Sequence, residues 1–152
     1  MNQAKAGRYE RIIVQVRDLI QATDNPISRM ATINALLHHK MQSFFWTGFY
    51  LLHHGELVVG PYQGPLACLK LKKNTGVCWA GINNGEIVVV PDVHQFPGHI
   101  ACSPLSRSEI VVPLRDAGNR IIGVLDIDSK DLNAFDEVDR TYLEKLVGMI
   151  YG

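Results

Sequence analysis

The residues best suited to chemistry gather between Val88 and Asp128, where a cysteine thiol, two histidine imidazoles and several carboxylates are close in the sequence. The thiol and the imidazoles lie in a loop rich in proline and glycine, with apolar runs before and after it. Scaffolds commonly carry reactive groups on loops held between strong strands. We therefore take this segment as the hypothesis for a reactive site, and its candidates are His94, His99, Cys102, Glu109, Asp126 and Asp128.

Cys102 is the candidate nucleophile of this segment. A thiolate is the attacking form of cysteine, and nearby cations and backbone N–H groups raise its fraction, so the loop histidines and Arg107 are candidates for that electrostatic help. Glu109, Asp126 and Asp128 would oppose a thiolate if they were ionised and close. Clustered carboxylates raise one another's pKa, however, so one of them can stay protonated at neutral pH and donate a proton to a leaving oxygen. An ionised carboxylate can instead bind a substrate ammonium group.

The residues alone leave other interpretations open. The carboxylates could be ordinary solvated residues at strand ends, although Asp126 interrupts the apolar run IIGVLDI. The cysteines could pack in the core. His94, His99 and Cys102 could also bind a metal, with Cys68 or Cys78 as a fourth ligand. Structural zinc sites usually show paired ligands such as C-x₂-C, and their absence here disfavours that alternative.

Composition excludes several classes of protein. The 152 residues are enough for one domain with its own core. Lysine and arginine number 15, as do aspartate and glutamate, which argues against a general nucleic-acid binder. No apolar run of about 18 residues indicates a membrane span, and the first residues lack the apolar block of a signal peptide. With only three cysteines, a secreted disulfide framework is not expected, so we expect a cytoplasmic protein.

Hydrophobic periodicity and turn signals predict an α+β domain. The last helix should begin at Asp136, which has Asp139 three residues later in a pattern related to the capping box. Two histidines at the end of the second helix, His38 and His39, are expected to be solvated. This order of elements favours an antiparallel sheet covered by terminal helices. We expect helices at 8–21, 27–40, 77–83 and from 136 onward, and strands at 44–52, 56–60, 67–71 (with Cys68), 86–90, 109–114 and 120–127.

The aromatic strand FFWTGFYLL has two distinct faces. Because side chains alternate along a strand, Trp46, Gly48 and Tyr50 share one face, and Phe45 and Phe49 share the other. One face must belong to the core. The other is either a second buried layer or an aromatic wall of a pocket, in which Gly48 would leave room for a ligand.

Six stretches of the chain resemble the free methionine-(R)-sulfoxide reductases, a catalytic branch of the GAF-domain superfamily. They are VVVPDVHQFPGHIAC, SRSEIVVPL, GVLDIDS, FFWTGFYLL, GPYQGPLAC and NTGVC, and the resemblance covers nearly the whole chain. The PDVH…FPGHIAC segment is specific to this branch. The resemblance implies a single GAF-like catalytic domain over residues 1–152, with an antiparallel sheet of about six strands flanked by N- and C-terminal helices.

The resemblance also implies roles for the three cysteines. Cys102 in GHIAC matches the catalytic thiol that attacks the sulfoxide sulfur, and Cys68 in GPLAC matches the recycling cysteine that forms a disulfide with it. Cys78 in TGVC matches a third, auxiliary cysteine. One departure from the family pattern is Trp79, a bulky residue where a small one is expected, which could alter lid motion or access to Cys78.

Substrate contacts follow from the same resemblance. Glu109, Asp126 and Asp128 match the carboxylates around the substrate, with Glu109 or Asp126 as proton donor. Trp46 and Tyr50 match the aromatic wall of the pocket, which favours the second interpretation of that strand face.

The implied activity is the reduction of free L-methionine-(R)-sulfoxide to L-methionine, an oxidoreductase reaction that counters oxidative stress. It proceeds through a cysteine sulfenic acid and an intramolecular disulfide that thioredoxin or a similar dithiol recycles. No metal and no organic cofactor are expected, nor a nucleic-acid or membrane partner, and a homodimer is left open. The alternatives from other classes are a non-catalytic GAF-type sensor of a small molecule or of redox state, and a structural domain with inert thiols.

Overall fold

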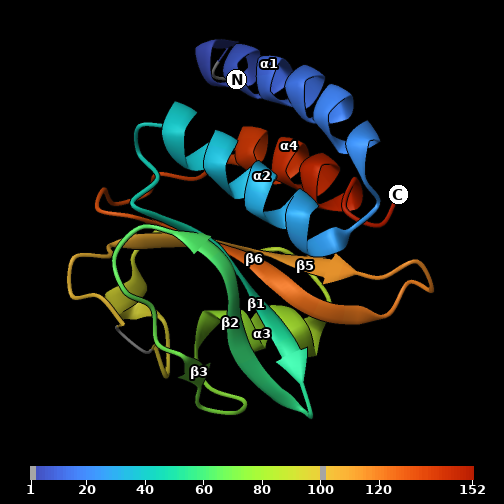
Figure 1. The fold of residues 1–152 in the computed structure, drawn as a ribbon. Coiled ribbons are helices and arrows are strands. Elements are labelled where there is room, and N and C mark those ends of the chain that lie inside the picture. Colours follow the sequence, from blue (N-terminus) through green and yellow to red (C-terminus); the bar gives the residue numbers. More distant parts are fainter. Residues whose placement is uncertain (1–2, 100–101) are drawn as a thin grey trace.

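In the computed structural model, which describes residues 3–99 and 102–152, three helices lie on one side of a six-stranded sheet, two of them against it and the first outside those two (Figure 1). These helices are α1 (Gln3–Leu19), α2 (Pro26–Lys40) and α4 (Glu137–Gly148). The short helix α3 (Gly76–Asn84) and the loops that carry the cysteines lie on the opposite face. The α+β architecture expected from the sequence is therefore confirmed, with the terminal helices together on one side.

The sheet is antiparallel throughout, in the order β3-β2-β1-β6-β5-β4. The two central strands, β1 and β6, are the ones that carry the aromatic wall and the aspartates. The strands are β1 (Trp46–His53), β2 (Glu56–Gln63), β3 (Lys70–Leu71), β4 (Val88–Val90), β5 (Ser108–Arg115) and β6 (Ile121–Ser129), and short 3₁₀ turns span Ile20–Ala22 and Val93–Gln95.

Strand alternation divides the buried side chains into two clusters. On β1, Phe49 packs toward the helices, whereas Trp46 and Tyr50 pack toward α3. On β5, Ile110 faces the helices and Val111 faces α3 in the same way. The helix-side cluster is larger and holds most of the fully buried side chains, so the other face of the sheet can carry polar groups without loss of the main core.

Local sequence signals start two of the helices, and the signal at α4 was expected. Pro26 occupies the first turn of α2, and the side chain of Asn25 accepts a hydrogen bond from the Ser28 N–H. At α4, Asp136 and Asp139 form the complete capping box.

The buried carboxylate of Asp139 also ties α4 to α1. It accepts a hydrogen bond from Lys5 Nζ at 2.6 Å and another from the Tyr9 hydroxyl. Burial and this carboxylate raise the pKa of Tyr9. The two terminal helices are thus held together by a polar contact as well as by apolar packing.

Three local expectations were wrong. Cys68 lies in an irregular loop, because the expected strand at 67–71 shortens to Lys70–Leu71. His38 is half-buried, with its Nδ1 3.1 Å from Thr47 Oγ1, and burial lowers its pKa; only His39 is exposed. Phe45 precedes β1 and packs on the α3 side, so strand alternation does not apply to it.

None of the helices in the described part of the chain has the length and hydrophobicity that a membrane-spanning segment needs.

Candidate active site

A hollow of about 600 Å³, including its solvent-open part, lies between the sheet and the loops on the α3 side. It collects residues from β1, β3, β5, β6 and α3, from the loops on either side of β3, and from the loop between β4 and β5. Seven of the eight site residues expected from the sequence line it, and the eighth, Cys68, is bonded to one of them. The seven are Trp46, Tyr50, Cys78, Cys102, Glu109, Asp126 and Asp128.

The register of the central strands gathers the carboxylates. Glu109 on β5 lies opposite Asp128 on β6, and Asp128 in turn lies opposite Trp46 on β1. Asp126 lies opposite Gly48. Because directly opposed residues share one face of a sheet, Glu109, Asp126, Asp128 and Trp46 all point toward the hollow.

Burial raises the pKa of each of these three carboxyl groups. Glu109 and Asp126 are each only 5% exposed. Burial raises the pKa of Glu109 well above its usual value, and the neighbouring Asp126 and Asp128 raise it further. Burial also raises the pKa of Asp126, although hydrogen bonds from Glu109 and Cys78 partly offset it. At neutral pH this cluster can hold a proton for transfer to a substrate oxygen.

Asp128 differs from its neighbours in exposure and in its hydrogen-bond partner. It is half-buried, and burial together with Asp126 raises its pKa, while a hydrogen bond from the Ser106 side chain lowers it. Ser106 itself is buried and lines the hollow, but no sequence pattern had marked it. Asp128 is therefore the carboxyl group placed to meet a ligand at the open part of the hollow.

The aromatic wall is a stack of three rings. The Trp46 ring lies between Tyr50 and Tyr62, with centroid distances of 5.6 and 5.2 Å. Trp46 Nε1 donates to the Pro65 carbonyl at 3.1 Å, and the Tyr50 hydroxyl donates to the Cys68 carbonyl at 3.3 Å. Burial raises the pKa of Tyr50, which keeps its phenol protonated. Tyr62 was not expected, because its pairing with β1 depends on the hairpin register.

Gly48 does not leave space for a ligand, contrary to the expectation. A Cβ atom at this position would lie 2.6 Å from the Trp46 ring and closer still to Tyr62 Cβ. The glycine therefore lets the aromatic stack close over β1, and the space it vacates is filled by protein.

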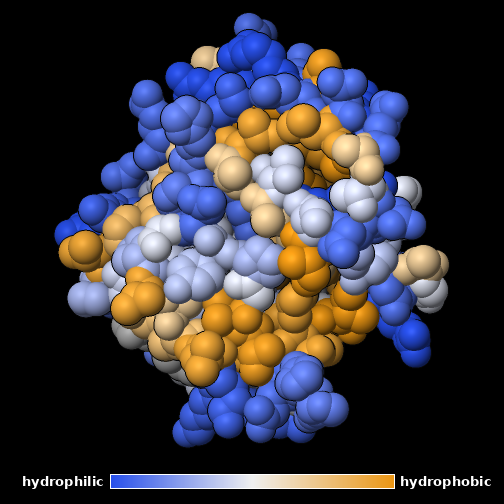
Figure 2. Space-filling model, in the orientation of Figure 1, coloured by the Kyte–Doolittle hydropathy of each residue, from blue (hydrophilic) through white to orange (hydrophobic). Residues whose placement is uncertain are grey.

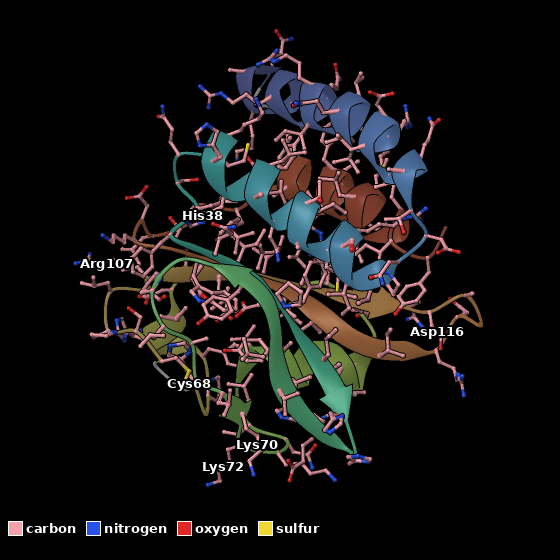
Figure 3. The ribbon with its side chains drawn as sticks, viewed as in Figure 1. His38, Cys68, Lys70, Lys72, Arg107 and Asp116 are labelled. Carbon is pink, nitrogen blue, oxygen red and sulfur yellow. A yellow bond between two sulfur atoms is a disulfide. The ribbon has the colours of Figure 1, made fainter. Side chains whose placement is uncertain are left out.

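Two of the three cysteines form a disulfide, as the family resemblance implied. Cys68 and Cys102 are bonded, with their Cα atoms 5.5 Å apart (Figure 3). Cys102 lines the hollow, whereas Cys68 does not. Within GHIAC, residues 100 and 101 lie outside the described part of the chain.

Cys78 is the free, buried cysteine. Burial and the nearby carboxylates raise the pKa of its thiol, so it is a poor nucleophile. Its neighbour Trp79 is buried in the α3-side cluster and does not line the hollow.

The expected cationic help for Cys102 is not seen. His99 lines the hollow, but burial and His94 lower its pKa, so its imidazole is neutral at neutral pH. Its Nε2 is buried and has no hydrogen-bond partner among the described residues, which leaves it available to a ligand. His94 and Arg107 are exposed and do not line the hollow.

The metal-ligand set considered from the sequence does not form, because the disulfide uses Cys102 and Cys68. Among the described residues a different group, Cys78, Glu109 and Asp126, has potential ligand atoms within 4.8 Å of one another. The raised pKa values of all three favour their protonated forms, which suits proton transfer better than cation binding.

Fold and site together define a class of protein. The sheet has helices on one face and, on the other, a hollow lined by a short helix and loops, which is the arrangement of a GAF domain. The family model described as GAF domain matches residues 32–150.

Individual relatives show to which group within the GAF-domain family the chain is similar. The chain is 46% identical to GAF domain-containing protein A of Dictyostelium discoideum, over 97% of this chain and 92% of the relative. It is 42% identical to the free methionine-R-sulfoxide reductase of Escherichia coli, over 82% and 74%. The free methionine-R-sulfoxide reductase of Neisseria meningitidis, solved in complex with its substrate, superposes with a TM-score of 0.91 at 44% identity, over 97% and 88% of the two chains. The chain thus belongs to the GAF-domain family and, within it, to the free methionine-R-sulfoxide reductases.

Proposed function

We propose that this protein reduces free L-methionine-(R)-sulfoxide to L-methionine. The observation that carries the proposal is the Cys68–Cys102 disulfide beside a hollow lined by buried carboxyl groups and an aromatic wall. A bonded cysteine pair of this kind is the product that a thiol-dependent sulfoxide reductase must form and then recycle. Relatives named for this activity support the same conclusion.

The chemistry begins once the disulfide is reduced. The Cys102 thiolate attacks the sulfoxide sulfur, and a protonated carboxyl group of Glu109 or Asp126 donates a proton to the sulfoxide oxygen. The sulfur–oxygen bond of the substrate breaks, the oxygen passes with the proton to Cys102 Sγ as a sulfenic acid, and methionine leaves. The Cys68 thiol then displaces this oxygen as water and re-forms the disulfide. An external dithiol, for which we propose thioredoxin in the cytoplasm, returns both cysteines to thiols.

Recognition of the free amino acid would depend on charge and shape. The stacked rings of Trp46 and Tyr50 offer an apolar surface to the methyl and methylene groups of the side chain. Asp128 is the least buried of the three carboxyl groups and can pair with the α-ammonium. A methionine sulfoxide within a peptide lacks that ammonium group.

The test is a stereospecific turnover assay. Reduced protein with dithiothreitol should form methionine from the free R epimer and not from the S epimer. Without reductant, each protein should lose two thiols as the disulfide forms, whereas a non-catalytic sensor would lose none. Turnover of the S epimer, or thiol loss without methionine formation, would refute the proposal.

Substitution of each paired cysteine by serine tests the role assigned to it. Cys102→Ser should lower turnover at least about a thousandfold, because a hydroxyl is a far weaker nucleophile at neutral pH. Cys68→Ser is the matched variant: it should still form about one methionine per protein, since attack precedes disulfide formation. If Cys102→Ser keeps its activity, the attacking thiol is a different one.

A further inference from the structure

The two sulfur atoms of the disulfide have different surroundings. Cys102 lines the hollow, and Cys68 lies outside it in the loop between β2 and β3. Leu66 and Leu69 flank Cys68 and are 87% and 78% exposed. Both cysteines are half-buried, so the direction of approach decides which sulfur a reductant meets. Over this loop it meets Cys68, whereas through the hollow it would meet Cys102.

Exposed apolar side chains concentrate around this disulfide. Of the seven large hydrophobic residues that are exposed in the described part of the chain, three lie within three residues of a bonded cysteine: Leu66, Leu69 and Leu105. Figure 2 shows an orange region low on this face, over the loop where Figure 3 labels Cys68. Apolar residues gathered at an exposed site commonly mark a surface that binds another protein.

A basic margin borders the same loop. Three lysines follow Leu69 in the sequence: Lys70, Lys72 and Lys73. The Lys70 Nζ atom lies 3.5 Å from Glu56 Oε1. Lys72 and Lys73 are exposed and form no ion pair with any described residue. Figure 2 shows hydrophilic residues in blue below the orange region, in the area where Figure 3 labels Lys70 and Lys72. A partner with acidic residues around an apolar centre would complement it.

We propose that these residues form the docking surface for a protein dithiol of the thioredoxin class, and that its thiolate attacks Cys68 Sγ rather than Cys102 Sγ. We call this surface the disulfide rim; it consists of Leu66, Leu69, Leu105, Lys72 and Lys73. The inference deepens the proposed function, on which it rests for the need of a reductant. The partner must be a dithiol, because it has to reduce a disulfide. Because the rim combines apolar side chains with lysines, we expect the partner to be a protein with acidic residues around an apolar centre.

Attack on Cys68 yields a balanced pair of exchange steps. The partner thiolate bonds to Cys68 Sγ, the Cys68–Cys102 bond breaks, and its electron pair leaves on Cys102 as a thiolate. The second thiol of the partner, once deprotonated, then displaces Cys68, so that the partner becomes a disulfide and Cys68 becomes a thiol. The first product of the exchange is thus Cys102 in its nucleophilic form, already at the hollow.

The rim can be tested without any sulfoxide present, which separates it from the proposed function. The oxidised protein is mixed with reduced thioredoxin, or with dithiothreitol as a small dithiol that needs no docking, and release of thiols is followed over time. Leu69→Ser and the double variant Lys72→Glu, Lys73→Glu should each lower the second-order rate constant with thioredoxin at least about fivefold. The rate with dithiothreitol should be unchanged. The matched control is Val14→Ser, which removes an exposed apolar side chain on α1.

The attacked sulfur is identified by trapping. A thioredoxin that has lost its second active-site cysteine stops at the mixed disulfide, and acid quenching followed by peptide mapping shows which cysteine carries it. The adduct should be on Cys68. An adduct on Cys102, or rim variants that react with thioredoxin as fast as the control, would overturn the inference. If thioredoxin reduces the disulfide normally but the protein does not turn over sulfoxide, the proposed function is refuted, whereas the inference about the disulfide rim is not.

Discussion

Glu109, Asp126 and Asp128 are held in the site at a cost to stability. Each would be better solvated in the unfolded chain, and burial is the main reason that their pKa values are raised in the folded protein. Between its usual value of 4.5 and its raised value, Glu109 binds more protons in the folded state than in the unfolded state. The free energy of unfolding must therefore fall as pH rises through the raised pKa.

Glu109→Gln should show this cost directly. Glutamine cannot ionise, so the variant should lose less stability than the wild type as pH rises, with a relative gain of about 1 to 3 kcal/mol between pH 5 and pH 8. Urea unfolding of the oxidised proteins at several pH values measures it, with exposed Glu144→Gln on α4 as control. The same variant should have a lower kcat if Glu109 is the proton donor. Parallel pH profiles for wild type and variant would show that Glu109 is not held protonated.

Asp128 should decide whether the substrate must be a free amino acid. Asp128→Asn should mainly raise KM for methionine sulfoxide, because the amide cannot pair with the α-ammonium. For the wild type, N-acetylation of the substrate should lower kcat/KM by about a thousandfold, since it removes the cation that pairs with the half-buried Asp128 carboxylate and adds bulk. Steady-state kinetics on both substrates measure this. Comparable rates on the free and acetylated compounds would contradict an ion pair at Asp128.

At the scale of elements, β1 positions the aromatic wall only because Gly48 has no side chain. Gly48→Ala should lower the free energy of unfolding by about 1 to 3 kcal/mol, because its Cβ would displace Trp46 or Tyr62. KM should rise as well, since the Trp46 ring must move. Gly148→Ala is the control, because a Cβ there meets no atom within 4 Å. A variant with wild-type stability and KM would mean that the stack is loose enough to absorb a methyl group.

The elements that could be predicted are those with local causes. Alternation along β1 placed Trp46 and Tyr50 on one face, and Asp136 marked the start of α4. Partnerships between distant segments could not be predicted in this way. Asp139 was expected to serve the capping box, but its burial also depends on Tyr9, which is 130 residues away. The stack of Tyr62 on Trp46 likewise requires the hairpin register, which short-range patterns do not fix.

The site shows the same division between local and long-range information. The family motifs named the cysteines, the carboxylates and the two aromatic residues, and all of them meet at one place. The neutral state of His99 and the role of Ser106 beside Asp128 come from burial, which depends on the whole fold. The extent of the strand near Cys68 also depends on a distant segment, because β3 is defined by its pairing with β2, which involves only Lys70 and Leu71 of β3.

At the scale of the whole molecule, the disulfide joins two loops that are 34 residues apart in the sequence. A crosslink of this span should stabilise the folded protein by about 3 to 4 kcal/mol, chiefly by restricting the unfolded chain. Urea unfolding with and without a non-thiol reductant measures the difference. Cys68→Ser should match the reduced wild type under both conditions. Equal stability of the oxidised and reduced forms would show that the reduced loops make compensating contacts.

β1 contributes side chains to the buried clusters on both faces of the sheet, and this limits how the chain can change over evolutionary time. Odd-numbered Phe49 fills the helix-side core while even-numbered Trp46 and Tyr50 face the hollow. A single-codon insertion or deletion between them would move one set of side chains to the wrong layer and would damage folding and binding at once. Length changes should accumulate instead in the turns, so the spacing of this strand is a more durable marker of descent than the identity of any one of its residues.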